Sequence, residues 1–166
     1  MLTREPQRLV VVAPLVPLTR GVSFPVAEWP LHVTVLPPFL TRSTPEQVAL
    51  VIAEVVASQT ALTARAGADA LFGRKHDVPV TLVHEQAGLT RLHDRLVEAL
   101  RPLAARPEEP AFTGAEFRAH ITVKGDSRVA EGDRITLTQL ALVDMTPRAD
   151  AAGRTVLATV ALLPQP

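Results

Sequence analysis

The segments LHVTV at residues 31–35 and AHITV at residues 119–123 are nearly the same. In both, a histidine and a threonine alternate with apolar residues, which is the two-residue period of a β-strand. Each segment is therefore predicted to be a strand with its polar pair on one face and its apolar residues on the other. One fold is expected to present this pair twice. The side chains of the repeat are His32, Thr34, His120 and Thr122.

The composition is typical of an ordinary soluble globular domain. The chain has 166 residues, of which 47% are hydrophobic, and this length is enough for one domain with a buried core. Its 17 basic and 17 acidic residues leave no formal net charge. Proteins that bind long nucleic acids without sequence preference rely on a basic surface. The charge therefore favours a small ligand, or only the end of an RNA, as the partner.

Other features of the composition bound the location and the chemistry. The chain has no cysteine, which excludes disulfides, thiolate catalysis and cysteine-ligated metals. It has no signal-peptide pattern and no apolar stretch long enough to span a bilayer, so we expect a cytoplasmic protein without a membrane partner. Its basic residues are fifteen Arg and two Lys, which indicates a GC-rich, bacterial source. No segment points to an obligatory protein partner, so a monomer is expected.

Hydrophobic periodicity divides the chain into strands and two helices. The first helix is predicted over residues 45–58, because Thr44 is a good N-cap and Pro45 suits the first helical position. The second is predicted over residues 88–101, along a stripe of leucines. Residues 102–110 are expected to be a loop. Strands are predicted at 8–16, 31–36 (ending at Pro37-Pro38), 60–71, 78–83, 117–124, 134–143 and 154–163.

Each half of the chain then contains one helix and one tetrad strand. Short connections between the late strands, such as residues 146–153, favour antiparallel pairing over a doubly wound parallel sheet. We therefore expect residues 1–166 to form a single α+β domain of two pseudo-symmetric lobes. The sheets should be mainly antiparallel with outer helices, and each lobe should contribute one His-x-Thr-x strand to a central cleft.

The paired tetrads resemble those of the 2H phosphoesterase superfamily, which includes bacterial 2′-5′ RNA ligase-like proteins and 2′,3′-cyclic nucleotide phosphodiesterases. The resemblance covers most of the chain, and Phe117, three residues before His120, is similar to the aromatic residue common before the second tetrad. Ala119 stands where a proline is frequent in the family. The basic residue that usually follows the second tetrad must here be Lys124 or Arg128.

The resemblance implies a metal-independent phosphoesterase. Its expected substrates are a 2′,3′-cyclic phosphate or a 2′-5′ phosphodiester, at an RNA end or in a small nucleotide. Run in reverse, with a sugar hydroxyl in place of water, the same reaction would be 2′-5′ RNA ligation.

The residues themselves suit this chemistry. Opening a cyclic phosphodiester requires a base, an acid and donors to the phosphoryl oxygens. Histidines titrate near pH 6.5, so one can be neutral while the other is protonated around neutral pH. We assign the acid to His32 and the base to His120, although the substrate's orientation decides between them. Thr34 and Thr122 can donate hydroxyl hydrogen bonds, and no metal or other cofactor is required.

Two further residues are candidates for substrate binding. Lys124 faces the cleft by strand parity and could hold the phosphate, although a solvated lysine at a strand end is an equally good interpretation. Phe39 and Trp29 flank the first tetrad, where an aromatic ring could stack on a base or pack on the sheet.

The other histidines receive plainer interpretations. His93 is expected on a solvated helix face, His84 at a strand end and His76 in a basic turn that could touch a phosphate. The zero net charge is compatible with a local basic rim around the cleft. Its candidate members are Arg20, Arg42, Arg74 and Arg118.

Two alternatives remain at this stage. The two tetrad histidines and Asp144 could bind a metal for metal-assisted hydrolysis, although the sequence lacks the ligand spacing typical of such sites. A non-catalytic module that binds a nucleotide or an RNA end is the second alternative.

Overall fold

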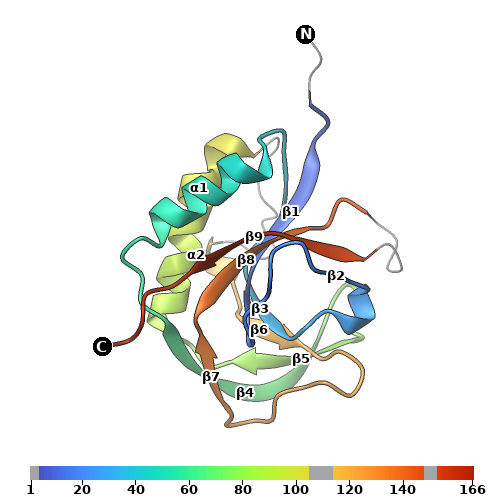
Figure 1. The fold of residues 1–166 in the computed structure, drawn as a ribbon. Helices are drawn as coiled ribbons and strands as arrows, with labels where there is room; N and C mark the ends of the chain where they lie inside the picture. The colour runs from blue at the N-terminus through green and yellow to red at the C-terminus, as the bar shows by residue number, and fades with distance from the viewer. Residues whose placement is uncertain (1–3, 105–113, 148–152) are drawn as a thin grey trace.

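The computed structural model describes residues 4–104, 114–147 and 153–166. The strands and α-helices of these residues are shown in Figure 1. They are β1 (Gln7–Pro14), β2 (Ser23–Phe24), β3 (His32–Thr41), α1 (Pro45–Val55), β4 (Leu62–Phe72), β5 (Val78–Val83), α2 (Ala87–Leu100), β6 (His120–Thr122), β7 (Arg134–Leu137), β8 (Gln139–Asp144) and β9 (Arg154–Ala161). Short 3₁₀ turns lie at Val26–Glu28 (η1), Arg101–Leu103 (η2) and Gly114–Glu116 (η4).

The strands form one nine-stranded sheet in the order β2-β9-β8-β1-β3-β6-β5-β4-β7. All pairs of named strands are antiparallel, which confirms the predicted α+β class with antiparallel pairing. The tetrad strands β3 and β6 are direct neighbours in the middle of the sheet, with Val33 opposite Ile121. The two tetrads therefore meet at the centre of the fold.

The sheet is strongly curled. A single residue, Thr138, separates β7 from β8, yet β7 pairs with β4 at one edge while β8 pairs with β1 and β9. Strands β7 and β8 thus form one continuous stretch of chain that joins the β4 edge of the sheet to the β1–β9 half. The sheet therefore curls round, as Figure 1 shows. Helices α1 and α2 lie side by side on one face, where α1 contacts β9 and α2 contacts β3.

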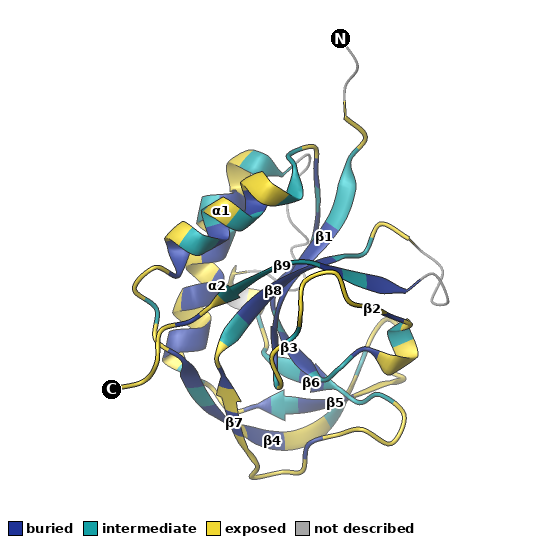
Figure 2. Ribbon diagram, in the orientation of Figure 1, coloured by how far each residue is buried: buried dark blue, intermediate teal, exposed yellow. Residues whose placement is uncertain are grey.

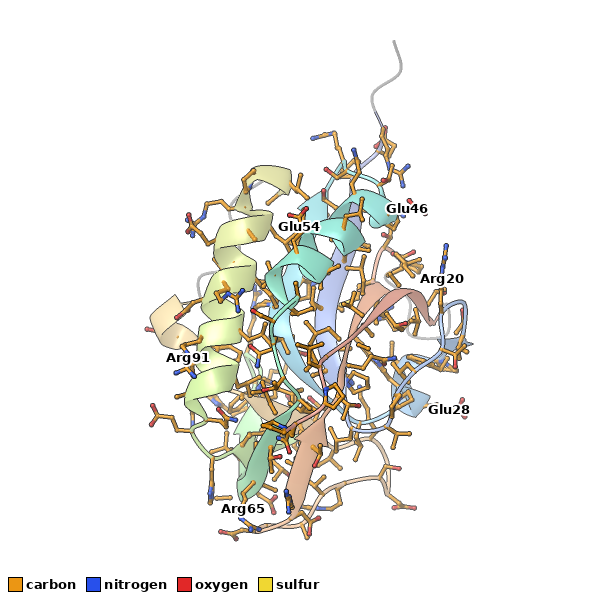
Figure 3. All side chains as sticks on the ribbon, turned by 60° about the vertical axis from the view of Figure 1, so that its left-hand side comes forward. Arg20, Glu28, Glu46, Glu54, Arg65 and Arg91 are labelled. Atoms are coloured by element: carbon orange, nitrogen blue, oxygen red, sulfur yellow. The ribbon has the colours of Figure 1, made fainter. Side chains whose placement is uncertain are left out.

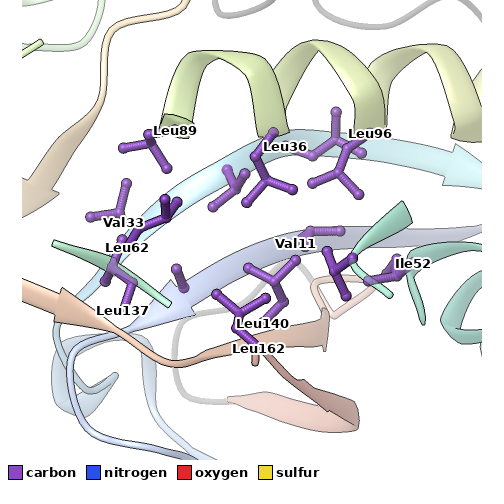
Figure 4. Packing of buried hydrophobic residues seen from close by; sticks show 14 of the residues in the cluster. Val11, Val33, Leu36, Ile52, Leu62, Leu89, Leu96, Leu137, Leu140 and Leu162 are labelled. Carbon is purple, nitrogen blue, oxygen red and sulfur yellow. The ribbon is translucent and has the colours of Figure 1, made fainter. Parts of the chain in front are cut away.

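The main core fills the space between the two helices and the sheet. Figure 2 shows that the inner sides of the helices are buried and their outer sides exposed. Val33 and Leu36 of β3 pack in this core with Leu89 and Leu96 of α2, as Figure 4 shows. Because Val33 and Ile121 both belong to this core, alternation sends the neighbouring histidines and threonines to the opposite face of the sheet.

Strand β1 is buried on both faces. Leu9 and Val11 pack in the main core, whereas Val10 and Val12 pack in a second cluster with Trp29 on the other face. This explains why the sequence reads as a continuous apolar run rather than an alternating one. The second cluster holds the segment before β3 against the sheet.

Both helices begin close to their predicted starts. The Thr44 hydroxyl accepts a hydrogen bond from the Gln47 N–H (3.2 Å), and the Gln47 side chain accepts one from the Thr44 N–H (2.8 Å). In α2 the Gln86 side chain caps the first turn by accepting from the Gly88 N–H. The helices end at Val55 and Leu100, whereas the sequence predicted ends at residues 58 and 101.

The prediction that the first tetrad strand ends at Pro37-Pro38 is wrong, because β3 continues to Thr41. The register between β1 and β3 shifts at this point, with Leu36 and Phe39 paired on either side of the prolines. A proline cannot donate to a ladder, but it is tolerated at such an irregularity. Two other predictions differ in extent: β6 covers only 120–122, and the strand predicted at 134–143 is interrupted at Thr138.

Leu92 and Leu50 allow a matched test of the core, because the same substitution is made in a helix at 1% and at 67% exposure. Leu92→Ala should lower the free energy of unfolding by about 2–5 kcal/mol, since it leaves a cavity under α2. Leu50→Ala should change it by less than about 0.5 kcal/mol. Urea denaturation followed by circular dichroism measures both, and equal losses would contradict the described packing.

Candidate active site

The pairing of β3 with β6 arranges the two tetrads head to tail. Val33 lies opposite Ile121 in an antiparallel pair, so His32 lies across from Thr122 and His120 across from Thr34. Each histidine is therefore next to the threonine of the other tetrad. All four side chains project from the face of the sheet that the helices do not cover. The structure thus brings together the four residues that the sequence repeat singled out.

Both histidines are oriented by the same backbone contact. The Nδ1 atom of His32 is 2.8 Å from the Pro30 carbonyl oxygen, and that of His120 is 2.8 Å from the Arg118 carbonyl oxygen. A carbonyl only accepts, so in each ring Nδ1 carries the hydrogen and donates it. In the neutral ring Nε2 is then left with a lone pair and is the atom available for proton transfer. Sequence analysis missed this feature, because every residue has a carbonyl and none signals the contact.

An aromatic ring packs against each histidine. Trp29 stacks on His32 with ring centres 4.2 Å apart, and Phe72 meets His120 edge-on at 4.6 Å. A cation lies over each aromatic ring in turn: Lys124 Nζ is 5.6 Å from the Trp29 centre, and the Arg118 guanidinium is 5.4 Å from that of Phe72. The two halves of the site therefore share one pattern of histidine, aromatic ring and cation.

The surroundings lower the pKa of both histidines and so favour their neutral forms. Burial lowers the pKa of His32 from 6.5 to about 4, and the charge of Lys124 and the neighbouring His120 act in the same direction. Burial also lowers the pKa of His120, helped by the charge of Arg118. The hydrogen bonds to the Pro30 and Arg118 carbonyls oppose these shifts without cancelling them. His32 is the more enclosed of the two, with 8% of its surface exposed.

A cavity of about 270 Å³ opens beside His120. Its walls are mostly apolar, and its polar side chains are Thr34, Thr122, His120 and Arg118. The described residues that line it are Thr34, Pro37, Pro38, Phe72, Gly73, Val78, Val80, Phe117, Arg118, His120 and Thr122. The aromatic walls come from the end of β4 and from the segment before β6. Of these two rings the sequence analysis singled out Phe117 alone, since nothing in the sequence links Phe72 to a tetrad.

The substrate-binding candidates have different positions. Lys124 is at the site, close enough to influence the pKa of His32. Phe39 is not brought to the tetrads: it is 7% exposed and packs in the core beside Leu36 and Val97. The register irregularity at Pro37-Pro38 precedes it, and its ring faces α2 rather than the cavity. Trp29 serves as a packing partner of His32.

The proposed arginine rim is only partly present at the cavity. Arg118 lines it. Arg20 lies instead in a groove beside α1 and β9, and Figure 3 shows its side chain projecting outward near Glu46. Charged side chains such as Arg91 likewise point away from the fold in this view. Arg74 lies in the exposed turn that follows Gly73, a lining residue.

The structure does not support the metal site with Asp144. Asp144 lies opposite Leu9, whereas His32 lies opposite Pro14, so the two are separated by roughly 16 Å along β1. Among the described residues, no group of three or more His, Cys, Asp or Glu side chains could hold a metal ion. This alternative is therefore not carried further.

The solvated position predicted for His93 is wrong. His93 is fully buried on α2, where its ring stacks on Phe117 and both ring nitrogens have backbone partners. The polar neighbours Asp94 and Arg95 suggested that His93 lies on an exposed face of the helix. His93 instead belongs to the buried stripe of α2, so its side chain faces the core. His84 and His76 lie, as expected, at the end of β5 and in the exposed β4–β5 turn.

A family model described as the 2′-5′ RNA ligase superfamily matches residues 17–154. The chain belongs to the 2′-5′ RNA ligase superfamily. The predicted resemblance to 2H phosphoesterases is thereby confirmed, and membership of the superfamily supports a phosphoesterase-type activity. None of the curated proteins matches the chain.

Solved structures with the same fold extend over nearly the whole chain. A structure described as a phosphoesterase is 18% identical with a TM-score of 0.59, covering 95% of this chain and 99% of the other. Escherichia coli LigT in complex with 3′-AMP is also 18% identical with a TM-score of 0.59, covering 96% and 99%. A protein of Thermus thermophilus is 21% identical with a TM-score of 0.57, covering 95% and 99%. At these identities the similarity establishes the fold.

Within residues 4–104, 114–147 and 153–166, no helix is both long and apolar enough to cross a bilayer.

The burial of His32 predicts a specific dependence of stability on pH. Its pKa is 6.5 when exposed and about 4 in the folded chain, so between these values the unfolded chain binds the extra proton. The free energy of unfolding should therefore fall as the pH drops from 6.5 to 4. The fall should be shallower in His32→Gln, which lacks this group.

Urea denaturation at a series of pH values between 4 and 7 measures this slope. His76→Gln, which replaces an exposed histidine outside the site, is the control and should keep the wild-type slope. A slope in His32→Gln as steep as that of the wild type would contradict the described burial.

Proposed function

We propose that the protein is a metal-independent phosphodiesterase that hydrolyses 2′,3′-cyclic phosphates or 2′-5′ phosphodiesters of RNA ends or small nucleotides. The observation that carries the proposal is the head-to-tail arrangement of the tetrads. It supplies two histidines with their Nε2 atoms available for proton transfer and a threonine next to each. Two proton-transfer groups and two hydroxyl donors are what the hydrolysis of a phosphodiester requires.

The difference in burial between the histidines favours one direction of proton transfer. His32 stays neutral above about pH 4 and is suited to be the base, which reverses the assignment made from the sequence. His120 lines the cavity, where the negative charge of a bound phosphodiester would raise its pKa and favour its protonated form. His120 is then the acid.

The proposed reaction needs no component beyond water. A water molecule attacks phosphorus and loses its proton to Nε2 of His32, forming a new P–O bond. The bond from phosphorus to the leaving sugar oxygen breaks, and that oxygen takes the proton from Nε2 of His120. The product is a phosphomonoester with a free sugar hydroxyl. Exchange of protons with solvent then restores His32 and His120 for the next turnover. With a sugar hydroxyl in place of water as the nucleophile, the same attack on a cyclic phosphate would form a 2′-5′ linkage and release the other ring oxygen as a hydroxyl.

The polar groups around the histidines are suited to hold the phosphate. The hydroxyls of Thr34 and Thr122 line the cavity and can donate to its non-bridging oxygens. Lys124, beside Trp29, adds a positive charge near His32. These groups oppose the negative charge that builds on the phosphoryl oxygens during the reaction.

The apolar part of the cavity is suited to a nucleobase. Phe72 and Phe117 provide aromatic surface, and Val78 and Val80 complete an apolar wall. Among the described residues that line the cavity there is no side-chain amide or carboxylate, so these contacts favour the faces of a base over its edges. The crystal structures of LigT with 3′-AMP and with ATP support a nucleotide as the ligand. An RNA end or a small nucleotide as substrate agrees with the cytoplasmic location expected from the sequence.

Replacing the histidines tests the reaction. His32→Ala and His120→Ala should each lower kcat/KM for nucleoside 2′,3′-cyclic monophosphates by about 10²–10⁴-fold in metal-free buffer, since each removes one proton-transfer group. Product analysis by chromatography measures the turnover. Full activity in both variants would refute the mechanism. Tight nucleotide binding by the wild type without any product would instead establish the non-catalytic binding module.

The pH profile tests the assignment of base and acid. With His32 as base, kcat/KM should rise through about pH 4, and with His120 as acid it should fall again on an alkaline limb below pH 6.5. Initial rates are measured at low substrate concentration between about pH 3.5 and 9, because this range covers the titration of histidine side chains. A flat profile would count against both assignments.

Phe72 and Leu71 are neighbours on β4, which gives a matched pair for the base-binding cavity. Phe72→Ala should raise KM for a nucleoside 2′,3′-cyclic monophosphate several-fold, because it removes an aromatic wall. It should leave KM for glycerol 1,2-cyclic phosphate, which has no base, nearly unchanged. Leu71→Ala, at an exposed position outside the cavity, should behave like the wild type with both substrates. An equal rise in KM for both substrates in Phe72→Ala would exclude the base-binding role.

A further inference from the structure

His93 is a buried imidazole that the proposed reaction does not use. It lies in the middle of α2 and is 0% exposed. Its Nδ1 lies 2.7 Å from the Val35 carbonyl oxygen, and its Nε2 accepts a hydrogen bond from the Gly114 N–H at 3.0 Å. The carbonyl only accepts and the N–H only donates, so the ring is the neutral tautomer with its hydrogen on Nδ1.

These two partners belong to the two tetrad segments. Val35 directly follows Thr34 in β3, whereas Gly114 begins the 3₁₀ turn η4 that leads to β6. The His93 ring also stacks face to face on Phe117, with ring centres 4.0 Å apart and planes inclined by 8°. One side chain on α2 therefore contacts both the strand of the first tetrad and the approach to the second.

The approach segment carries two features of the active site. Phe117 is a wall of the cavity, and the Arg118 carbonyl accepts the hydrogen bond that orients His120. Strand β6 has three residues, which pair with β5 on one side and, at Ile121, with Val33 of β3 on the other. The last backbone hydrogen bond before the strand joins the Ala119 carbonyl to the Val83 N–H. Arg118 lies just before this ladder, so the position of its carbonyl is set from one side by the ladder and from the other by the contacts of residues 114–117.

The two hydrogen bonds of the His93 ring explain why a polar residue occupies this buried position. A leucine or phenylalanine would fill the space under α2, but it would leave the Val35 carbonyl and the Gly114 N–H without this partner. Burying a polar ring is favourable only where its nitrogens are hydrogen-bonded, and both are.

We propose that His93 is a positioning residue, which ties the approach to the second tetrad against the strand of the first and thereby sets the orientation of His120. It acts through Phe117 and the Arg118 carbonyl and touches no reacting group. The part of this proposal that concerns turnover rests on the proposed function, whereas the orientation of His120 can be measured without it.

Two variants separate the contacts of His93. His93→Phe keeps a planar ring for stacking on Phe117 and removes both hydrogen bonds, whereas His93→Gln retains an acceptor that can reach the Gly114 N–H. Leu96→Val is the matched control, because Leu96 is also fully buried, one turn further along α2. Its aliphatic side chain can form no hydrogen bond with Val35 or Gly114. All three are compared at a temperature where circular dichroism shows each to be folded.

The first readout is the imidazole nitrogen spectrum of His120 from long-range ¹⁵N–¹H correlations. We expect the Nδ1–H tautomer of His120 to dominate in the wild type and in Leu96→Val, and to lose population in His93→Phe. The second readout is turnover of glycerol 1,2-cyclic phosphate, where kcat should fall about 10–100-fold in His93→Phe, since misplacing a reacting group is costly. His93→Gln should recover most of that loss, and Leu96→Val should keep the wild-type kcat.

The outcomes decide the proposal. A folded His93→Phe with an unchanged His120 spectrum, or the same spectral change in Leu96→Val, would overturn it. If the wild type turns over no phosphodiester, the proposed function fails while the spectrum still tests the positioning. If neither His93 variant folds, Phe117→Leu takes their place, because it removes the stacked ring from a half-buried position; an unchanged His120 spectrum there would also overturn the proposal.

Discussion

The direct antiparallel pairing of β3 with β6 is the constraint on which the site depends. With Val33 opposite Ile121, each histidine is placed across from the threonine of the other tetrad, and a slip of either strand by one residue would turn its histidine and threonine into the core. The apolar residues between them enforce this register, since they are buried beneath α2. Packing on the helix face of the sheet therefore determines the chemistry on the opposite face.

Burial gives the two histidines unequal properties within a nearly symmetric frame. Both donate Nδ1–H to the carbonyl two residues earlier, and both pack against an aromatic ring. The rings differ in what covers them: Trp29 is part of a buried cluster on β1, whereas Phe72 borders an open cavity. The resulting difference in desolvation separates a histidine that stays neutral from one that a bound anion can protonate.

Most of the elements followed from the period and the capping residues of the sequence. Thr44 and Pro45 located the start of α1, and the leucine stripe located α2, because these signals are local. Pro37-Pro38 misled the prediction for β3, because a proline ends a strand only where its neighbour needs the missing N–H. The exposed position predicted for His93 was wrong for a similar reason. The faces of α2 were judged from the neighbours Asp94 and Arg95, whereas the partners of His93 come from distant segments of the fold.

The sequence by itself determined which residues carry the chemistry: the repeat named His32, Thr34, His120 and Thr122, and strand alternation placed each pair on one face. Only the tertiary structure decided that the tetrads pair head to tail, that Phe72 rather than Phe39 borders the cavity, and that backbone carbonyls select the histidine tautomers. The physical reason is that alternation is a property of neighbouring residues. Strand order, burial and backbone hydrogen bonds depend on segments that are distant in the chain.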